Sequence, residues 1–255
     1  MPQNRKRYTQ MSEPLTFVTF RWQPPKGYRS TFGPETVYAL REMIGRHYRK
    51  PHRFVCVTDQ PAALPGVETI QLWPDCAGIP SPVGHSYPSC YRRLRLFAPD
   101  AGEVFGDRLV SIDLDTVIVG DITPLFDRPE HFVIWGESDF PHTTPYCGSL
   151  WMLKTGTRSR AWTEFKPETS PRMAWKAGCR GSDQGWLAYI LGKGEATWTR
   201  KDGVYSYRKH IARMGNRLPD DARIAVFHGK EDPWNYKMQQ IPWVKEHYPA
   251  MQVPA

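Results

Sequence analysis

The chain has 255 residues, of which 40% are apolar and 24% charged, and its net charge is +8. This composition predicts a soluble globular protein with a sizeable core, and the lack of long apolar runs excludes a membrane-spanning protein. The basic, polar start of the chain does not resemble a signal peptide. Five cysteines, without any CxxC pair, favour reduced thiols in a cytoplasmic protein over a disulfide framework or a zinc site.

The positive charge favours anionic partners such as nucleic acid, membrane lipid or phosphorylated substrates, and a peripheral membrane contact is compatible with it. Solubility alone explains the same charge equally well. Aromatic residues reach 13%, with ten Trp. Such a surplus is common in proteins that stack on sugars or bases, but aromatic residues are also ordinary core material.

Short apolar runs bounded by polar or turn residues predict the strands. They lie at residues 15–20, 53–59, 67–72, 108–112, 132–135, 149–153 and 223–227. Apolar residues at helical spacing predict a first helix over residues 34–48, with Pro34 in its first turn. Strand, helix and strand in this order predict a Rossmann-like, mostly parallel central sheet flanked by helices, an α/β fold. Residues 1–13 are expected to form a disordered leader and residues 14–255 a single domain.

Two further helices have recognisable starts. Residues 89–97 form a short helix, with Ser89 as its expected N-cap. Ser182 is placed to cap a helix that runs to Leu191, with Asp183 in the first turn, where a carboxylate suits the helix dipole. Loops rich in Pro, Gly or charged residues are expected over residues 74–88 and 199–222.

The sharpest functional signal is the segment RLVSIDLDTVIVGDITPLF, residues 108–126, in which a strand runs into Asp113 and Asp115. Ligands of open α/β sheets bind at the carboxyl ends of strands, and side chains at i and i+2 of an extended chain point the same way. Two acids so placed suit Mg²⁺ or Mn²⁺, which can bridge a nucleotide diphosphate and stabilise its departure. A solvated turn is the ordinary alternative, but acids set between apolar segments must be paired or metal-bound.

This segment and four others resemble glycosyltransferase family 8, the group that includes glycogenin and the bacterial lipopolysaccharide galactosyltransferases. The likeness follows the order YRRLRLF, DRLVSIDLDTVIVGDITPLF, GSLWMLKTG, SDQGWLAYIL and FHGKEDPW, and it spans residues 15–240. The second block is the most specific, because it combines a strand, the DxD acids, an apolar strand, a Gly-Asp pair and a Pro-Leu-aromatic turn. The resemblance implies the GT-A fold and a hexosyltransferase that uses a UDP-linked nucleotide sugar with retention at the anomeric carbon.

The resemblance also implies roles for individual residues. Asp113 and Asp115 match the family's ligands for Mn²⁺, or Mg²⁺, and Asp113 meets the donor diphosphate there. Arg93, in the short helix before the DxD strand, matches an Arg that contacts the donor, and a guanidinium suits phosphate or sugar hydroxyls. Asp183 and Gln184 match a pair beside the reacting carbon of the sugar. From the residues alone, the Arg-rich helix is as readily a solvated basic face, and Asp183 a helix cap.

The C-terminal motif departs from the family pattern H-x-x-G-x-x-K-P-W. The spacing is kept by Gly229, Pro233 and Trp234, whereas Val226 and Asp232 replace the His and the Lys. His228 and Lys230 lie two residues away, and a two-residue shift on a strand keeps the same face. We therefore expect His228 as a third metal ligand and Lys230 at the donor diphosphate. Tyr146 is a second departure, because members usually carry Asn there.

The end of the first strand should meet the base of the nucleotide, and Thr19 and Arg21 are the candidates there. Trp22 and Tyr28 could stack on the base or the sugar, although packing is the more ordinary role for Trp22. The expected partners are a nucleotide-sugar donor and a glycan or other hydroxyl acceptor, and no nucleic acid.

Three rival interpretations remain open from the residues. A sugar nucleotidyltransferase would share the fold and the acids, but RWQPPKGYRS after the first strand has one Gly where a Gly-rich phosphate loop is expected. A non-enzymatic nucleic-acid-binding domain would suit the charge, but no helix-turn-helix, RNP-type aromatic pair or zinc motif is recognisable. A degenerate, inactive family member would explain the altered C-terminal motif.

Overall fold

The computed structural model describes residues 13–24, 26, 28, 31–84, 89–137 and 141–250. Residues 1–12 of the expected leader and residues 85–88 of the expected 74–88 loop lie outside these ranges. The carboxylate of Glu13 accepts a hydrogen bond from the backbone N–H of Asp107 at 3.0 Å, so Glu13 belongs to the folded part of the chain. Among the described helices, none is both long enough and apolar enough to cross a bilayer.

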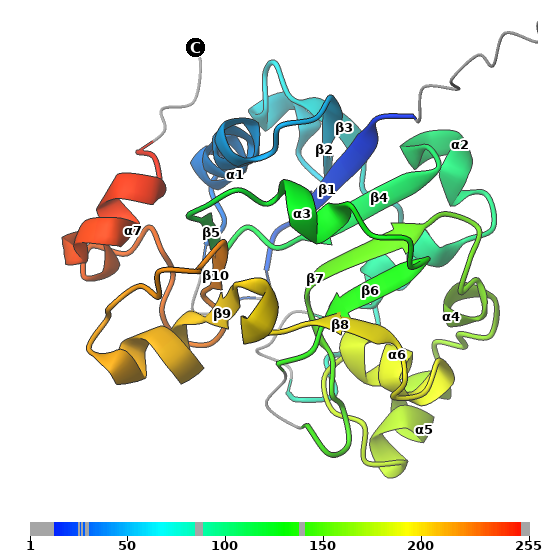
Figure 1. Cartoon of the computed structure of the whole chain (residues 1–255). Helices are drawn as coiled ribbons and strands as arrows, with labels where there is room; N and C mark the ends of the chain where they lie inside the picture. Colours follow the sequence, from blue (N-terminus) through cyan, green and yellow to red (C-terminus); the bar gives the residue numbers. More distant parts are fainter. Residues whose placement is uncertain are drawn as a thin grey trace, which may run out of the picture.

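A seven-stranded mixed sheet forms the centre of the molecule, in the order β3-β2-β1-β4-β7-β6-β8 (Figure 1). Its strands are β1 (Leu15–Arg21), β2 (His52–Thr58), β3 (Glu68–Gln71), β4 (Arg108–Ile112), β6 (Phe132–Trp135), β7 (Cys147–Lys154) and β8 (Ala196–Trp198). Only β7 runs against its two neighbours, and the other pairs are parallel. The predicted Rossmann-like, mostly parallel sheet is therefore confirmed.

A second, three-stranded sheet lies beside the central one (Figure 1). It contains β5 (Thr116–Ile118), β9 (Val204–Ser206) and β10 (Ile224–Val226). The middle strand β10 runs antiparallel to β5 and parallel to β9. The strand predicted at residues 223–227 therefore exists, but it pairs outside the central sheet.

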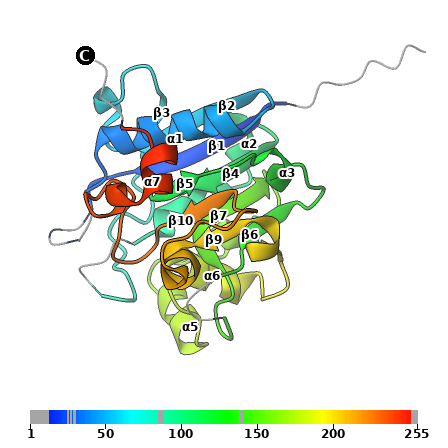
Figure 2. The same ribbon diagram turned by 60° about the vertical axis from the view of Figure 1, so that its left-hand side comes forward.

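Helices cover both faces of the central sheet (Figures 1 and 2). The α-helices are α1 (Pro34–His47), α2 (Ala101–Phe105), α3 (Thr123–Phe126), α4 (Arg160–Thr163), α5 (Ser170–Lys176), α6 (Asp183–Ile190) and α7 (Pro242–His247). The buried apolar residues form two cores, one on each face of the central sheet. The first core contains residues of α1, α3, α7 and the small sheet. The second core contains residues of α2, α4, α5, α6 and the 3₁₀ turn η2 (Tyr91–Phe97).

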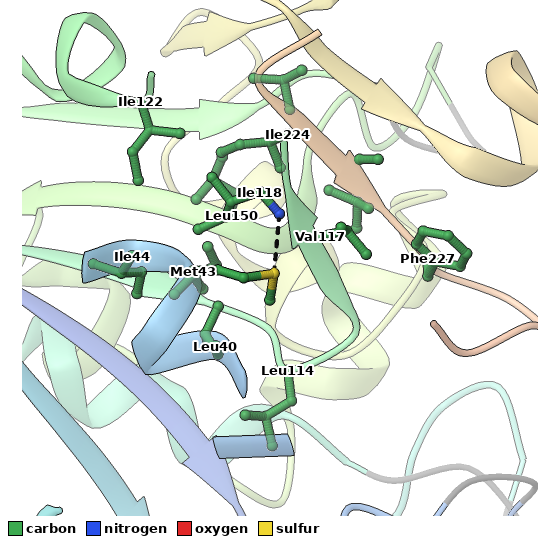
Figure 3. Packing of buried hydrophobic residues seen from close by; sticks show 14 of the residues in the cluster. Leu40, Met43, Ile44, Leu114, Val117, Ile118, Ile122, Leu150, Ile224 and Phe227 are labelled. Carbon is green, nitrogen blue, oxygen red and sulfur yellow. Dashed lines mark hydrogen bonds between the residues drawn. The ribbon is translucent and has the colours of Figure 1, made fainter. Parts of the chain in front are cut away.

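Alternation along the strands divides the apolar side chains between these two cores. On β1, Phe17 enters the first core and Val18 the second, as expected from the two-residue period of a strand. In the first core, the Met43 Sδ atom of α1 accepts a hydrogen bond from the Ile118 N–H at 3.4 Å (Figure 3). Leu114 is buried in the same core. Because Leu114 lies between the two aspartates of the DxD segment, it anchors that turn to the core.

Two of the predicted helix caps are wrong. The segment predicted as a helix over residues 89–97 is the 3₁₀ turn η2, with Cys90 rather than Ser89 at its N-cap. Ser182 occupies the N-cap position of α6 but makes no side-chain cap bond. Its hydroxyl instead accepts a hydrogen bond from the backbone N–H of Cys90 at 3.0 Å. A tertiary contact between two distant segments thus replaces the local cap that the sequence favours.

The segment expected to be loop-rich, residues 199–222, contains regular structure that the sequence did not predict. Besides β9, it forms the short helical turns η3 (Arg200–Asp202), η4 (Tyr207–Ile211, a π-helical turn) and η5 (Ala212–Met214). The strand is three residues long and needs the distant β10 as its partner, so no local periodicity reveals it.

Two buried thiols, Cys56 and Cys147, provide a test of the first core. All five cysteines are free, and burial raises the pKa of Cys56 to about 12 and that of Cys147 to about 11. Only the thiolate reacts with a disulfide reagent. We therefore expect Cys56 and Cys147 to be labelled at least about tenfold more slowly at pH 8 than the thiol of free cysteine. Their labelling should accelerate in denaturing urea, as followed by mass spectrometry of peptides. Rapid labelling of both in the native protein would contradict this packing.

Candidate active site

The DxD turn lies where the two sheets meet. Asp113 directly follows β4, and its backbone N–H donates to the carbonyl oxygen of Ser149 on β7 at 2.9 Å. Asp115 directly precedes β5, and its carbonyl oxygen accepts from the backbone N–H of Phe227 at 2.8 Å. One end of the turn is thus bonded to the central sheet and the other to the small sheet. Leu114 is packed in the core, and Asp113 and Asp115 both line one cleft.

That cleft combines aromatic and charged side chains. Its lining is Phe20, Trp22, Pro24, Tyr28, Phe32, Cys90, Arg93, Asp113, Leu114 and Asp115. The two aromatic residues predicted to stack on a base or sugar, Trp22 and Tyr28, therefore line the same cleft as the predicted metal acids. Such a surface is suited to a ligand that has both a flat ring and charged oxygens.

Arg93 connects three segments that lie far apart in the sequence. From η2, its Nη1 donates to Asp113 Oδ1 at 2.5 Å. Its Nε and Nη2 both donate to Asp183 Oδ2, at 2.8 and 2.6 Å, at the start of α6. Arg93 and Asp183 are 5% and 2% exposed, whereas the side chain of Asp113 is 32% exposed. A buried guanidinium therefore bridges a buried carboxylate and one that reaches the cleft.

The charges in this network depend on one another. Burial raises the pKa of Asp183, Arg93 opposes that rise, and Asp113 adds to it. Burial would lower the pKa of Arg93, but Asp183 and Asp113 outweigh it and hold the pKa well above its ordinary value. Arg93 is thus a permanent buried cation, and a cation in that environment must be paired.

Gly148, on β7, allows this network to close. Its backbone N–H donates to Gln184 Oε1 at 3.1 Å. A Cβ atom at this position would lie 2.6 Å from Arg93 Nη2 and 3.2 Å from Asp183 Oδ2, closer than side chains pack. The structure therefore brings Arg93, Asp113, Asp183 and Gln184 together, as the separate motifs predict, through a glycine.

The residues predicted to meet the base are engaged in the scaffold. The hydroxyl of Thr19 is fully buried and donates to the carbonyl oxygen of Ile112 at 2.9 Å. The Nε of Arg21 donates to the carbonyl oxygen of Phe32 at 2.8 Å, and Arg21 is 6% exposed. Both side chains support the walls of the cleft, and their contact with a base stays a prediction.

His228 and Lys230 line a second cavity. The strand β10 ends at Val226, so the same-face geometry expected for His228 does not extend to it. Its Nε2 lies 2.6 Å from Ser206 Oγ, and its Nδ1 lies 3.4 Å from Arg208 Nη2. The predicted roles of His228 at the metal and of Lys230 at the diphosphate are not tested by this arrangement and stay predictions.

The carboxylate oxygens of the cleft suit a hard divalent cation. Across the described ranges, no three His, Cys, Asp or Glu side chains are grouped so that they could hold a metal ion. Asp113 and Asp115 nevertheless line one cleft. Hard cations such as Mg²⁺ commonly bind through one or two carboxylates, waters and substrate phosphates. The two acids therefore fit a metal that binds together with a phosphate-bearing ligand.

Some residues of the cleft were not predicted. Phe32 lies in an irregular segment between β1 and α1, where no sequence periodicity indicates it. Cys90 had a signal, because it directly precedes the YRRLRLF block. Tyr146, at the position where family members usually carry Asn, is fully buried. Its hydroxyl donates to the carbonyl oxygen of Gly192 at 2.9 Å and accepts from the N–H of Glu195 at 3.0 Å.

Comparison with known proteins identifies the fold. No protein-family model and no curated protein sequence matches this chain. Among solved structures, the galactosyltransferase LgtC in complex with donor and acceptor sugar analogues is 13% identical, with a TM-score of 0.58, over 93% of this chain and 98% of LgtC. An active-site mutant of LgtC gives 13% identity and a TM-score of 0.56, over 91% of this chain and 95% of that one.

A third similar structure is the glycosyltransferase GlyE of Streptococcus pneumoniae. It is 15% identical, with a TM-score of 0.56, over 94% of this chain and 61% of GlyE. At such low identity, these likenesses concern the fold. They confirm that this chain has the GT-A fold that the sequence led us to expect.

Gly148→Ala tests the close approach at the centre of the network. The added methyl group must displace Arg93 or Asp183, so we expect the free energy of unfolding to fall by about 1–3 kcal/mol. Gly194→Ala is the matched control, because a Cβ there has no atom within 4 Å. Urea denaturation of both variants measures the difference. Equal stability of the two variants would show that the network tolerates a side chain at residue 148.

Proposed function

We propose that this chain is a metal-dependent glycosyltransferase. It transfers a hexose from a UDP-linked donor to an acceptor hydroxyl, with retention at the anomeric carbon. The observation that carries the proposal is the network in which Arg93 joins Asp113, in the cleft, to Asp183 at the start of α6. The GT-A fold shared with LgtC and GlyE supports it, since LgtC was solved with donor and acceptor sugar analogues.

In this proposal, the aromatic side of the cleft receives the nucleotide. Trp22 and Tyr28 line it and offer flat faces for the base or ribose. Asp113 and Asp115 would hold Mn²⁺ or Mg²⁺, which would act as a Lewis acid on the leaving diphosphate. Lys230 is the proposed further contact of the diphosphate, as the family pattern implies.

Arg93 and its partners would act on the sugar. The guanidinium fixes the positions of Asp113 and Asp183 and offers N–H groups suited to donor oxygens. When the bond between the anomeric carbon and the phosphate oxygen breaks, positive charge develops on the sugar ring. Asp183, which accepts a hydrogen bond from Arg93, would stabilise that charge, with Gln184 beside it. The acceptor hydroxyl then attacks the anomeric carbon.

The metal acids are tested by titrating UDP into the protein in the presence and absence of MnCl₂. We expect Asp113→Asn and Asp115→Asn to weaken Mn²⁺-dependent UDP binding at least about tenfold, because each removes an anionic ligand. Asp127→Asn is the control, since Asp127 is a surface carboxylate paired with Lys50 at 3.0 Å. Undiminished Mn²⁺-dependent binding would remove the two acids from the site. A screen of nucleotide sugars for Mn²⁺-dependent hydrolysis then identifies the donor.

The proposed third ligand is tested by His228→Ala. Loss of the imidazole should raise the Mn²⁺ concentration needed for half-maximal UDP binding, because one ligand is lost. Ser206→Ala is the matched control, since it removes the hydroxyl that contacts the imidazole and leaves the ring in place. An unchanged Mn²⁺ requirement in His228→Ala would leave the two aspartates as the protein's ligands.

A further inference from the structure

The second cavity is large and basic. It lies between the turn η4 (Tyr207–Ile211) and the segment after β10, and its volume of about 640 Å³ falls in the range of small-molecule sites. Its charged lining consists of Arg208, Lys230, Glu231 and Lys237, together with the imidazole of His228. Three cations thus face one carboxylate, and the cavity carries net positive charge.

The cations of this cavity are accessible to a ligand. Arg208, Lys230 and Lys237 are all exposed side chains. The Nζ of Lys237 lies 3.9 Å from Oε1 of Glu231, the outer limit of an ion pair, and exposed pairs of this kind contribute little. A doubly charged anion that takes the place of Glu231 beside Lys237 would therefore displace only a weak ion pair.

The wall of the cavity is held in a defined shape. Gly229 has a φ of +116°, a conformation that favours glycine, and a Cβ there would lie 3.1 Å from Cδ and Nε of Arg208. The Arg208 side chain therefore lies against the backbone of Gly229, with its Nη2 3.4 Å from His228 Nδ1. The hydroxyl of Ser206 contacts His228 and accepts the backbone N–H of Lys209, which fixes the start of η4. Such π-helical turns frequently occur at functional sites.

The remaining lining is mostly apolar and could hold the body of a ligand. Tyr207 stacks on Phe227, with ring centroids 4.3 Å apart, and Met238 and Ile241 complete this side. Phe227 is also the residue whose N–H bonds to the carbonyl oxygen of Asp115. In the segment after β10, the lining therefore begins at His228, two residues after the end of that strand, and it shares no residue with the lining of the cleft.

We propose that this cavity binds a phosphate group carried by the acceptor, so that the acceptor is a phosphate monoester. The inference rests on the proposed glycosyltransferase function and names its acceptor class. Phosphate is favoured over carboxylate because a guanidinium fork with two ammonium groups suits a multiply charged oxyanion. The acceptor is favoured over the donor because Asp113, Asp115 and Arg93 line the other cleft, and because Arg208 and Lys237 of this cavity have no part in the proposed donor site.

The experiment titrates glucose 6-phosphate, with glucose as the neutral control, into protein saturated with UDP and MgCl₂, followed by NMR. We expect the phosphate ester to bind and glucose to bind at least about tenfold more weakly. Arg208→Gln/Lys237→Gln should lose at least about tenfold in affinity for the ester. Arg213→Gln/Arg217→Gln is the matched control, because these two exposed cations lie in the same excursion and outside the lining of the cavity. Lys237→Gln alone gives a second variant that leaves the contact of Arg208 with His228 intact.

The outcomes separate this proposal from the proposed function. An equal loss in the control double variant, or equal binding of glucose and its phosphate, would overturn the phosphate cavity. A parallel loss of UDP affinity in the cavity variants would also overturn it, because the cavity would then belong to the donor. Failure of UDP to bind the wild-type protein would instead reject the proposed function, and the titration without UDP would still report on the cavity.

The source of the phosphate is distinguished by a sedimentation arm. Vesicles of phosphatidic acid, compared with phosphatidylcholine, test a phosphate monoester carried on a lipid. Binding to the anionic vesicles that is lost in Arg208→Gln/Lys237→Gln, and kept in the control double variant, would support a lipid-borne acceptor. Binding of glucose 6-phosphate without such vesicle binding would support a soluble phosphorylated sugar.

Discussion

The site depends on a single buried cation. Arg93 leaves water almost completely, and its charge is sustained only because Asp183 and Asp113 accept its hydrogen bonds. Removing one partner of a buried pair typically costs about 3–5 kcal/mol, because the other charge is left without compensation. The pairing therefore fixes the position of η2 against the end of β4 and the start of α6. The residues of the proposed chemistry are held by the same interaction that would orient the substrate.

The meeting of the two sheets adds a second constraint. Backbone bonds tie Asp113 to β7 of the central sheet and Asp115 to the chain directly after β10 of the small sheet. Leu114 is packed into the core between them, so the turn cannot rotate without exposing an apolar side chain. Two carboxylates that would repel each other in isolation are thus kept on one cleft. Such an arrangement concentrates negative charge where a divalent cation, which could also bind a diphosphate, would offset it.

Residues with local signals were predictable, and residues that depend on distant partners were not. Periodicity predicts the helix α1 and the strands of the central sheet that are longer than three residues. The position of Asp113 and Asp115 after β4 was also predicted, but the two acids lie in a turn rather than on an extended chain. The strands β8 and β9 have three residues each and were missed, because only their partners define them. Ser89 and Ser182 carry a capping signal, but a contact between Cys90 and Ser182 replaces the cap. The prediction that Arg93 and Asp183 belong to one site came from the family resemblance rather than from periodicity.

The altered C-terminal motif has a physical explanation in the small sheet. Val226, at the family's His position, is fully buried at the end of β10, and Asp232, at the Lys position, is 3% exposed. Restoring an imidazole at residue 226 would place a polar ring in an apolar core. The basic residues of this segment instead follow the end of the strand, where His228 and Lys230 line a separate cavity with Arg208. The two-residue displacement thus places His228 and Lys230 on the wall of that cavity, beyond the end of β10.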